Sequence, residues 1–356
     1  MIHEKTEKRI QYQAIQSRRH TMFGSGENEK LKVGVVGTGV LGRHHTRLYK
    51  ANDKVELMGI YDVSAKAAAD VGREFGVKVF PSIEALAAEC DAVTVAVPAT
   101  FHHETAMPLI EMGKHLLIEK PLASTVKDAR EMVAAAEARG IVFGVGHVER
   151  FNPAMDFLEK NKSNTLFIEA HRLAKYPPPR PGQHRRGTEV SVVLDLMIHD
   201  LDLVLTMVGS EVERFDAVGV PILSNTEDIA NVRLKFKSGA VANITASRVS
   251  AEPMRKFRIF QTDSYISMDY AKNTGKIYRK GFLGVGKKNL NLCEKNALAD
   301  EINNFVSAVI ETKKTGVLVQ PKVPGRQGLK ALELAVAICE EIQAYNEKYG
   351  LYKFKK

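Results

Sequence analysis

The feature that most constrains the fold of this chain is a glycine-rich loop near its start, Gly37-Thr38-Gly39-Val40-Leu41-Gly42. The loop follows a valine-rich segment, residues 33–36, and opens a segment of helical composition, the setting in which a GxGxxG pattern has meaning. There Gly37 permits a tight turn, Gly39 lets the backbone approach a pyrophosphate, and Gly42 lets helix and strand pack closely. The helix N-terminus then faces the phosphates. We therefore predict a dinucleotide site, and a glycine-rich turn without a ligand is the less favoured alternative.

The segment from residue 31 to residue 150 alternates between short apolar runs and helical patterns. The runs have the length and apolarity of buried parallel strands, and they cover residues 32–36, 55–61, 92–97, 115–118 and 141–145. The helical patterns cover residues 40–50, 64–75, 102–112 and 124–139, and we expect Ser64 and Ser124 to be N-caps. Such alternation predicts an α/β Rossmann domain with a doubly wound parallel sheet.

The second half of the chain, residues 151–356, has a different rhythm. Strand-like runs between residues 212 and 280 follow one another with few helical interruptions, and a turn at Lys237-Ser238-Gly239 predicts a hairpin between residues 230–237 and 240–248. A further strand is expected at residues 165–172, and helices at residues 151–160, 191–207, 297–311 and 325–345. We predict a C-terminal α+β domain with a large, mostly antiparallel sheet.

The residue that chooses the dinucleotide is Asp62, which ends the second predicted strand twenty residues beyond Gly42. A carboxylate at this position accepts hydrogen bonds from the ribose hydroxyls and repels a 2′-phosphate. No arginine follows within the next three residues to bind that phosphate. NAD is therefore favoured over NADP, while Ser64 and Lys66 leave dual use open. A simple strand-end cap is the alternative role of Asp62.

Charge and cysteine content set the broad class of the protein. The 356 residues carry a formal net charge of +9, which indicates an anionic partner. Because no nucleic-acid-binding motif occurs, an anionic cofactor and substrate account for the charge without DNA or RNA. Three scattered cysteines, Cys90, Cys293 and Cys339, form no CxxC pair and favour a reducing, cytoplasmic location. No apolar run approaches the length of a membrane span, and residues 1–30 are expected to be a mobile extension and not a secretory signal.

Two segments after the glycine loop carry a family resemblance: Pro98-Ala99-Thr100-Phe101-His102 and Gly113-Lys114-His115-Leu116-Leu117-Ile118-Glu119-Lys120-Pro121-Leu122. Together they resemble the Gfo/Idh/MocA oxidoreductases, and the resemblance extends over nearly the whole chain from Leu31. It implies that Lys120 lies at the nicotinamide end of the cleft. It also implies that Glu119 and the turn from Pro98 to His102 line the cofactor. A lone lysine is more often a surface residue, but Lys120 ends a buried parallel strand, where ligands bind.

A third segment, Leu194-Asp195-Leu196-Met197-Ile198-His199-Asp200, places Asp195 and His199 on one face of a helix. The resemblance implies that both stand beside the substrate and face Lys120. A neutral histidine suits the removal of a hydroxyl proton, Asp195 could orient it or hold a hydroxyl, and the Lys120 ammonium would stabilise an alkoxide. Asp and His at this spacing can also bind a metal, but no third ligand stands out, so we predict none.

The substrate is indicated by residues 146–153 (Gly-His-Val-Glu-Arg-Phe-Asn-Pro) and by Pro177-Pro178-Pro179-Arg180. With the Asp195–His199 segment they resemble family members that oxidise the 3-hydroxyl of UDP-N-acetylglucosamine. Guanidinium groups suit a pyrophosphate, so the candidate substrate residues are Arg150, Asn152, Arg172 and Arg180, with Arg185 and Arg186 nearby. A solvated basic loop is the alternative for each arginine. Relatives have glycine where this chain has Glu189-Val190-Ser191, which leaves less room near the sugar.

Two alternative functions remain open, and the sequence also predicts an oligomer. The chain could oxidise a free polyol such as inositol, or it could be a non-catalytic regulator that binds NAD and a sugar. Intact Lys120, Asp195 and His199 argue against the regulator. One face of the antiparallel sheet has no evident helical cover, which favours a homodimer or homotetramer through Val232, Leu234, Phe236, Val241 and Ile244. Cover by the chain's own C-terminal helices is the alternative.

Overall fold

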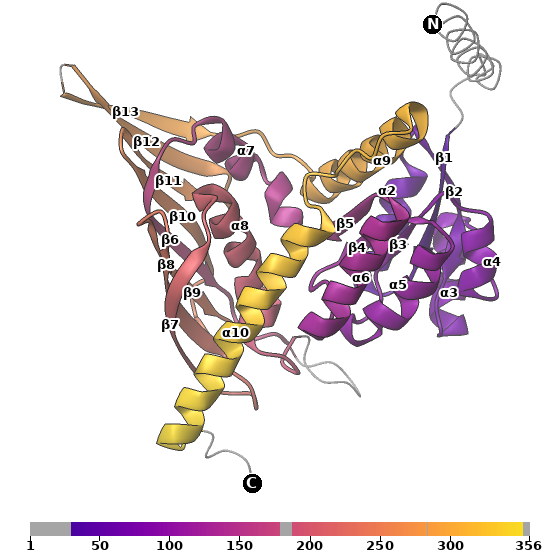
Figure 1. Ribbon diagram of the computed structural model, residues 1–356, viewed down its shortest axis with the longest axis horizontal. Helices are drawn as coiled ribbons and strands as arrows, with labels where there is room; N and C mark the ends of the chain where they lie inside the picture. Colours follow the sequence, from indigo (N-terminus) through magenta and orange to yellow (C-terminus); the bar gives the residue numbers. More distant parts are fainter. Residues whose placement is uncertain (1–29, 179–186, 283, 352–356) are drawn as a thin grey trace, which may run out of the picture.

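The computed structural model describes residues 30–178, 187–282 and 284–351, arranged around two sheets with helices between and beside them (Figure 1). The first is a five-stranded parallel sheet in the order β2-β1-β3-β4-β5. The second has eight strands and is mostly antiparallel. The predicted combination of a Rossmann-type sheet and a large antiparallel sheet is therefore confirmed. The predicted mobile extension, residues 1–30, lies outside the described residues except for Lys30.

The parallel strands are short because each is a buried apolar run that ends where the chain turns into a loop. They are β1 (Leu31–Val36), β2 (Val55–Tyr61), β3 (Ala92–Val95), β4 (His115–Glu119) and β5 (Phe143–Gly146). Four of them, β1, β3, β4 and β5, have four consecutive buried residues. This burial accounts for their continuous rather than alternating hydrophobicity. Their carboxyl ends lie at one edge of the sheet, where the glycine loop follows β1.

The helices of this half are α2 (Val40–Lys50), α3 (Ala65–Phe75), α4 (Ile83–Ala88), α5 (His102–Glu111) and α6 (Val126–Arg139). Ser64 caps α3 as predicted, its hydroxyl accepting the N–H of Ala67. The cap of α6 is Thr125 and not Ser124, because the hydroxyl of Thr125 accepts the N–H of Asp128 at 3.1 Å. Helix α4 was not predicted: its six residues give too little periodicity.

A helix from the far end of the sequence completes the first core. Helix α9 (Ala297–Thr315) buries Ile302, Phe305 and Val306 against Leu31 and Val33 of β1. In Figure 1 it lies beside α2, at the side of the parallel sheet away from α5 and α6. The predicted domain boundary at residue 150 separates the strands of the two sheets. It does not separate their cores, because residues 297–315 pack against the parallel sheet.

The second sheet has the order β13-β12-β11-β10-β6-β9-β8-β7. Only β6 and β9 pair in parallel; the other neighbours are antiparallel. The strands are β6 (Thr165–Leu173), β7 (Val212–Val220), β8 (Ile229–Phe236), β9 (Val241–Ser247), β10 (Met254–Gln261), β11 (Ser264–Asp269), β12 (Thr274–Gly281) and β13 (Gly284–Asn291). The predicted hairpin joins β8 to β9, with Gly239 at a φ of 85° in the turn.

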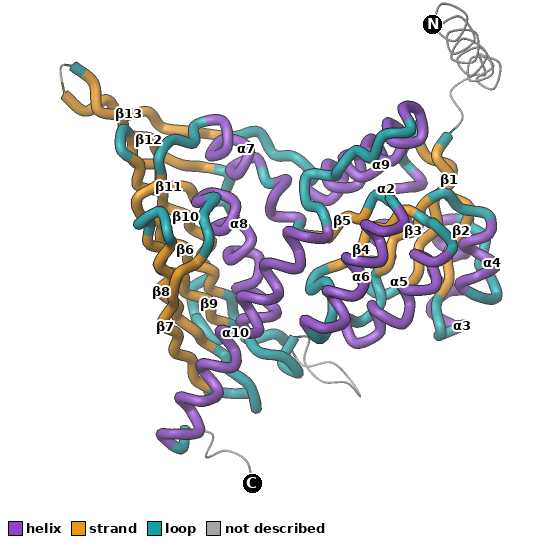
Figure 2. The backbone as a smooth tube through the Cα atoms, viewed as in Figure 1, coloured by secondary structure: helices purple, strands orange, loops and turns teal. Residues whose placement is uncertain are grey.

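Three helices cover one face of this sheet: α7 (Pro153–Lys160), α8 (Ile198–Val208) and α10 (Gly325–Tyr349) (Figure 2). Val232, Leu234, Phe236 and Ile244 point into this covered face and are almost completely buried. The prediction that these side chains meet a second subunit is therefore wrong. Val241 alone of that set lies on the opposite face, because it is an odd number of residues from Ile244 along β9.

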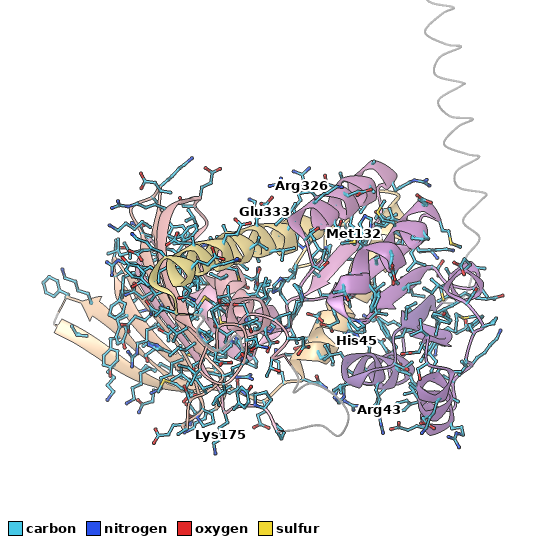
Figure 3. The ribbon with its side chains drawn as sticks, turned by 90° about the horizontal axis from the view of Figure 1, so that it is seen from below. Arg43, His45, Met132, Lys175, Arg326 and Glu333 are labelled. Atoms are coloured by element: carbon cyan, nitrogen blue, oxygen red, sulfur yellow. The ribbon has the colours of Figure 1, made fainter. Side chains whose placement is uncertain are left out.

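Helix α10 also joins the two halves of the molecule, since it contacts α6 as well as α8 and β7. Figure 3 shows Arg326 and Glu333 of α10 on the same side of the molecule as Met132 of α6. Arg326 pairs with Glu137, and Glu333 accepts from Arg130 at 2.7 Å. Among the described helices, none is long and apolar enough to cross a membrane.

Candidate active site

A pocket of about 520 Å³ lies between the two sheets, at the carboxyl ends of β4 and β5. This is the edge at which open parallel sheets bind ligands. One wall comes from the parallel sheet and the other from α8 and the ends of β6, β9 and β10. The charged or titratable residues that line it are Glu119, Lys120, Glu149, Arg172, Lys175, Asp195, His199, Arg248 and Arg255.

The glycine loop has the geometry that a dinucleotide requires. Gly37 has a φ of 90°, and a Cβ there would come within 2.8 Å of the backbone at Ala96 and Val97. A Cβ on Gly42 would come within 1.8 Å of the Gly37 carbonyl oxygen, so both positions need glycine. Gly39 faces open space and gives α2 no side-chain cap. The first N–H groups of α2 are therefore available to an anion, and the loop fits a pyrophosphate.

Asp62 and Thr38 connect the glycine loop to the end of β2. One oxygen of Asp62 accepts the Thr38 N–H at 2.6 Å and the Thr38 hydroxyl at 2.9 Å. The other accepts the N–H of Ser64 at 2.8 Å. Asp62 is thus a strand-end cap, and this is compatible with its predicted role at the ribose because each carboxylate oxygen can accept more than one hydrogen bond.

The residues predicted to line the cofactor from the other strands lie at the same sheet edge. Pro98 precedes a 3₁₀ turn, Ala99–Phe101, after β3, and Leu41 and Glu119 line the pocket. His102 is buried, with one ring nitrogen 3.0 Å from the carbonyl oxygen of Pro121 and the other 3.0 Å from that of Val97. Its contacts tie together the two loops that flank Lys120, so His102 has a bracing role.

Lys120 and Asp195 meet across the pocket. The Lys120 ammonium donates to the Asp195 carbonyl oxygen at 2.6 Å and lies 3.3 Å from its carboxylate. The lysine side chain is only 16% exposed, and the exposed part belongs to the pocket. Asp195 lies in a single π-helical turn, Val193–Met197, that leads into α8. Such turns occur frequently at functional sites.

His199, in the first turn of α8, lines the same pocket. Burial, with the charges of Lys120 and Arg172, holds the pKa of His199 well below its usual value. Its imidazole is therefore neutral at pH 7. Its Nδ1 is buried and has no hydrogen-bond partner among the described residues, and the His147 ring lies edge-on at 6.2 Å. The three predicted catalytic residues, Lys120, Asp195 and His199, thus converge on one pocket.

The predicted substrate residues are only partly brought together. Arg172 lines the pocket, but it is buried and paired, with its Nε 2.7 Å from Asp200 and its Nη1 2.9 Å from Glu149. These carboxylates raise the pKa of Arg172 despite its burial. Arg180, with Arg185 and Arg186, lies outside the described residues.

Arg150 and Asn152 do not line the pocket. Arg150 is buried further along the same face of α8 as His199, where it donates to Thr206 at 2.6 Å and to Gln327 at 3.2 Å. Asn152 caps α7 by accepting the N–H of Ala154. Both side chains thus support the scaffold beside the pocket, and their predicted contact with a substrate stays a prediction. Their nearness to the motif in sequence gave no information on which way each side chain points.

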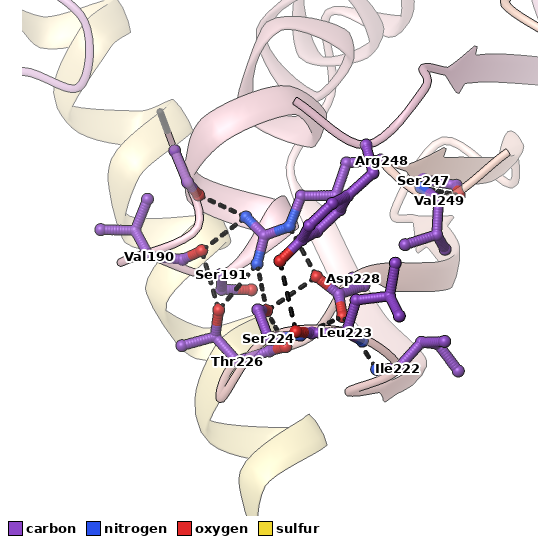
Figure 4. A network of polar contacts seen from close by, with 12 residues as sticks. Val190, Ser191, Ile222, Leu223, Ser224, Thr226, Asp228, Ser247, Arg248 and Val249 are labelled. Carbon is purple, nitrogen blue, oxygen red and sulfur yellow. Dashed lines mark hydrogen bonds and ion pairs between the residues drawn. The ribbon is translucent and has the colours of Figure 1, made fainter. Parts of the chain in front are cut away.

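Sequence reasoning missed two arginines of the wall. Arg248 follows β9 and is buried in a polar network, with Asp228 at 2.8 Å and the Val190 carbonyl oxygen at 2.8 Å (Figure 4). Asp228 in turn accepts three consecutive N–H groups, those of residues 222–224. Arg255 comes from β10 and contacts Glu149 at 3.3 Å. Only the strand order of the second sheet brings these residues to the pocket.

Behind the pocket, Glu119 belongs to a buried polar cluster with His45 and Glu301. His45 Nε2 lies 2.7 Å from Glu119, while both carboxylate oxygens of Glu301 have no hydrogen-bond partner among the described residues. These residues, and separately His103, Asp128 and Glu131, are close enough to hold a metal ion. Neither group includes Asp195 or His199, the face that we considered as a metal site.

The sequence and fold match known proteins in both halves. Residues 31–147 match the model of an oxidoreductase family with an NAD-binding Rossmann fold, and residues 164–267 match the GFO/IDH/MocA C-terminal domain. UDP-N-acetylglucosamine 3-dehydrogenase from Acidithiobacillus ferrooxidans is 36% identical over 316 residues, which are 86% of this chain and 97% of that protein. The chain belongs to the Gfo/Idh/MocA oxidoreductase family. It is therefore an NAD-binding oxidoreductase.

Two further comparisons describe how this Gfo/Idh/MocA protein relates to other members. A solved structure of the Acidithiobacillus enzyme superposes with a TM-score of 0.81 at 35% identity, covering 89% of this chain and 99% of that one. Myo-inositol 2-dehydrogenase from Thermotoga maritima is 26% identical and covers 88% of this chain and 96% of its own length. The family thus includes dehydrogenases of both a nucleotide sugar and a free polyol.

Proposed function

We propose that this protein uses NAD to oxidise a sugar hydroxyl to a ketone, and that its substrate is the 3-hydroxyl of UDP-N-acetylglucosamine or of a related nucleotide sugar. The observation that carries the proposal is the convergence of Lys120, Asp195 and His199 on one pocket. The choice of sugar is supported by the 36% identity to UDP-N-acetylglucosamine 3-dehydrogenase over almost the full length of that enzyme.

The reaction removes a proton from the hydroxyl oxygen and a hydride from its carbon. NAD, when bound, accepts the hydride. His199 is the base that accepts the proton, because burial keeps its imidazole neutral at pH 7. The Lys120 ammonium stabilises the negative charge that develops on the oxygen. Asp195 holds Lys120 in place from across the pocket through two contacts.

The preference for NAD over NADP follows from Asp62. Its carboxylate lies directly beside the glycine loop and is fixed there by Thr38 and Ser64. A 2′-phosphate at this position would meet a negative charge, whereas ribose hydroxyls would find an acceptor.

The test is the absorbance of NADH at 340 nm with NAD and UDP-N-acetylglucosamine, run beside inositol and glucose. We expect Lys120→Met to lower kcat by about 10²- to 10⁴-fold and to leave NAD affinity largely unchanged. Lys127→Met, which changes an exposed lysine on α6, is the control and should keep full activity. An unchanged rate in Lys120→Met would contradict the assigned role.

The same assay distinguishes the proposed reaction from the two alternatives, a polyol dehydrogenase and a non-catalytic regulator. Turnover of inositol without turnover of the nucleotide sugar would favour a polyol dehydrogenase, as in the Thermotoga relative. NAD binding without turnover of any sugar would favour the non-catalytic regulator. A cytoplasmic location, with Cys90, Cys293 and Cys339 as free thiols, stays a prediction.

We further propose that two copies associate through the uncovered face of the eight-stranded sheet. In Figure 1 no described helix lies on this face. It carries a row of neighbouring aromatic rings. The ring centroid of Phe260 lies 5.7 Å from that of Phe167, in a tilted pair, and 4.5 Å from that of Tyr265, which stacks in turn on Tyr278 at 5.5 Å. Glu169 and Arg258 lie beside them as a 2.8 Å ion pair. A face with both charges and an aromatic row can complement a copy of itself, and light scattering would give the stoichiometry.

A further inference from the structure

Three cations of the pocket wall meet at one edge of the eight-stranded sheet. Strands β6 and β9 are parallel and end side by side, and β10 begins beside the end of β6, where Met254 pairs with Leu173. Lys175 lies two residues beyond β6, Arg248 directly follows β9, and Arg255 is the second residue of β10. The strand order therefore brings to one place three positive charges that are far apart in the sequence.

Arg248 has no donor group left for a ligand. All three of its guanidinium nitrogens donate within the protein: Nε to Asp228, Nη1 to the carbonyl oxygens of Gly187 and Val190, and Nη2 to Ser224 and Thr226. Figure 4 shows the guanidinium surrounded by these partners. Arg172, on the neighbouring strand, is similarly occupied by Asp200 and Glu149. Both arginines thus belong to the scaffold of the wall.

Arg255 and Lys175 differ from them. The Arg255 side chain is 51% exposed, and its 3.3 Å contact is with an oxygen of Glu149 that already accepts from Arg172 at 2.9 Å. Lys175 is exposed, and among the described residues no carboxylate lies within 4.0 Å of its ammonium. Figure 3 shows Lys175 at the outer edge of its half of the molecule. Two cations with unused donors therefore face a pocket whose other charges are paired.

We propose that Arg255 and Lys175 bind the diphosphate of a sugar nucleotide and thereby place its sugar ring at Lys120 and His199. The proposal rests on the proposed function and gives its substrate selectivity a physical basis. A guanidinium can donate two parallel hydrogen bonds to phosphate oxygens, and a lysine adds a mobile point charge. A free polyol carries no charge and would leave both cations without a partner. Arg255 is thus the residue that distinguishes nucleotide sugars from free sugars.

The test compares Arg255→Gln and Lys175→Gln with wild type in steady-state kinetics, with UDP as a competitive inhibitor. We expect Arg255→Gln to raise KM for UDP-N-acetylglucosamine and Ki for UDP by the same factor, about 10- to 100-fold, because each charged hydrogen bond lost weakens both equally. Lys175→Gln should act in the same direction by less, and Arg255→Lys should recover part of the loss. The affinity for NAD should stay unchanged.

The matched control is Arg258→Gln, three residues along the same strand, with its oligomeric state compared with wild type by light scattering because Arg258 lies on the proposed dimer face. Arg258 makes a salt bridge to Glu169 of β6, as Arg255 does to Glu149, but its side chain lies on the opposite face and does not line the pocket. Loss of a salt bridge in β10 alone would therefore affect both variants similarly. Equal KM and Ki values in Arg255→Gln and wild type would overturn the proposal, as would equal effects of Arg255→Gln and Arg258→Gln.

Calorimetric titration of UDP and of inorganic pyrophosphate into the NAD-bound protein separates this proposal from the proposed reaction. Binding of both compounds, weakened by Arg255→Gln, supports a diphosphate site even if wild type oxidises no sugar, and then only the proposed reaction fails. Turnover of UDP-N-acetylglucosamine with full UDP affinity in Arg255→Gln keeps the reaction and removes the diphosphate site. Turnover of N-acetylglucosamine at the same kcat/KM as the nucleotide sugar would also overturn the proposal.

Discussion

At the scale of single residues, the least expected feature is an unsatisfied carboxyl group behind the active site. Glu301 of α9 is 2% exposed and has no hydrogen-bond partner among the described residues. Burial and the nearby charge of Glu119 raise the pKa of Glu301 well above its usual value. The pKa of Glu119 is instead lowered, because His45 donates to it and offsets its burial. The pKa values of the two neighbouring carboxyl groups are thus shifted in opposite directions.

The first prediction concerns the titration of Glu301. Because its pKa is higher in the folded than in the unfolded chain, the free energy of unfolding falls as pH rises above about 4.5, by about 1.4 kcal/mol for each pH unit until the folded-state pKa is reached. Glu301→Gln removes the titration and keeps the shape. We expect this variant to be more stable than wild type at pH 8 and similar to it at pH 4.5, as measured by urea denaturation. Glu311→Gln, an exposed position of the same helix, should give no such pH-dependent difference.

Single residues also show what the sequence could and could not reveal. Lys120, Asp195 and His199 were predicted from the family resemblance, and their strand position and i,i+4 spacing supported it. Arg255 and Arg248 were not, because their place depends on the pairing of β6 with β9 and β10, which no local pattern encodes. Arg150 does not line the pocket for a related reason: its nearness to the motif in sequence does not determine where its side chain points.

At the scale of elements, the turn before the catalytic helix is shaped around Asp195. Gly187 has a φ of 77°, and a Cβ there would come within 2.3 Å of the Asp195 carboxylate. Arg248 holds the Gly187 carbonyl oxygen in place. The resemblance implies a glycine where this chain has residues 189–191, and Gly187 provides the close approach to the aspartate from two residues before Glu189.

The second prediction follows from this contact. Gly187→Ala should displace Asp195 from Lys120 and lower kcat by about tenfold or more, since small misplacements of positioning groups are costly. Gly239→Ala is the matched control: Gly239 also has a positive φ, 85°, but a Cβ there meets nothing within 4 Å. Both variants should lose about 1 kcal/mol of stability to backbone strain. Equal kcat values for the two variants would show that the approach to Asp195 has no functional consequence.

Secondary structure was predicted well where a segment's own residues determine it. The five parallel strands are buried apolar runs, and the β8–β9 hairpin has its glycine at the turn. The faces of the second sheet were not separated, because Val241 and Ile244 both look like core residues in sequence although they lie on opposite sides of β9. Which face a helix covers is decided by α8 and α10, far away in the chain.

At the scale of the whole molecule, two C-terminal helices hold the halves together. Helix α9 returns to the parallel sheet and brings Glu301 to Glu119, while α10 spans from α6 to β7. The pocket lies between these halves, so its shape depends on contacts that close only when the last 60 residues or so have folded. Both helices were predicted from the sequence. Which sheet α9 packs against was not, because an apolar helix face does not identify its partner.

Buried histidines give the molecule a common response to acid. Burial is the main cause that lowers the pKa values of five of them, His102, His115, His147, His171 and His199. In the unfolded chain these groups take up protons near pH 6.5. Between that pH and their lower folded-state pKa values, the unfolded chain binds more protons than the folded one. The stability that these histidines contribute is therefore complete above pH 6.5 and is lost as pH falls below it.

The third prediction isolates one of these histidines. His115, at the start of β4 and away from the pocket, accepts the N–H of Val142 through Nδ1 at 2.9 Å, and this hydrogen bond requires a neutral ring. The amide oxygen of an asparagine can accept the same N–H without titrating. We expect the free energy of unfolding of wild type, from urea denaturation, to fall steadily between pH 7 and pH 5. The free energy of unfolding of His115→Asn should fall less steeply, by up to about 1.4 kcal/mol per pH unit for the one proton removed.

Glu301 acts in the opposite direction over the same pH range. Glu301→Gln should therefore make the fall steeper, and a double variant should restore a slope near that of wild type. Parallel slopes in wild type and His115→Asn would mean that this ring titrates alike in the folded and unfolded chains.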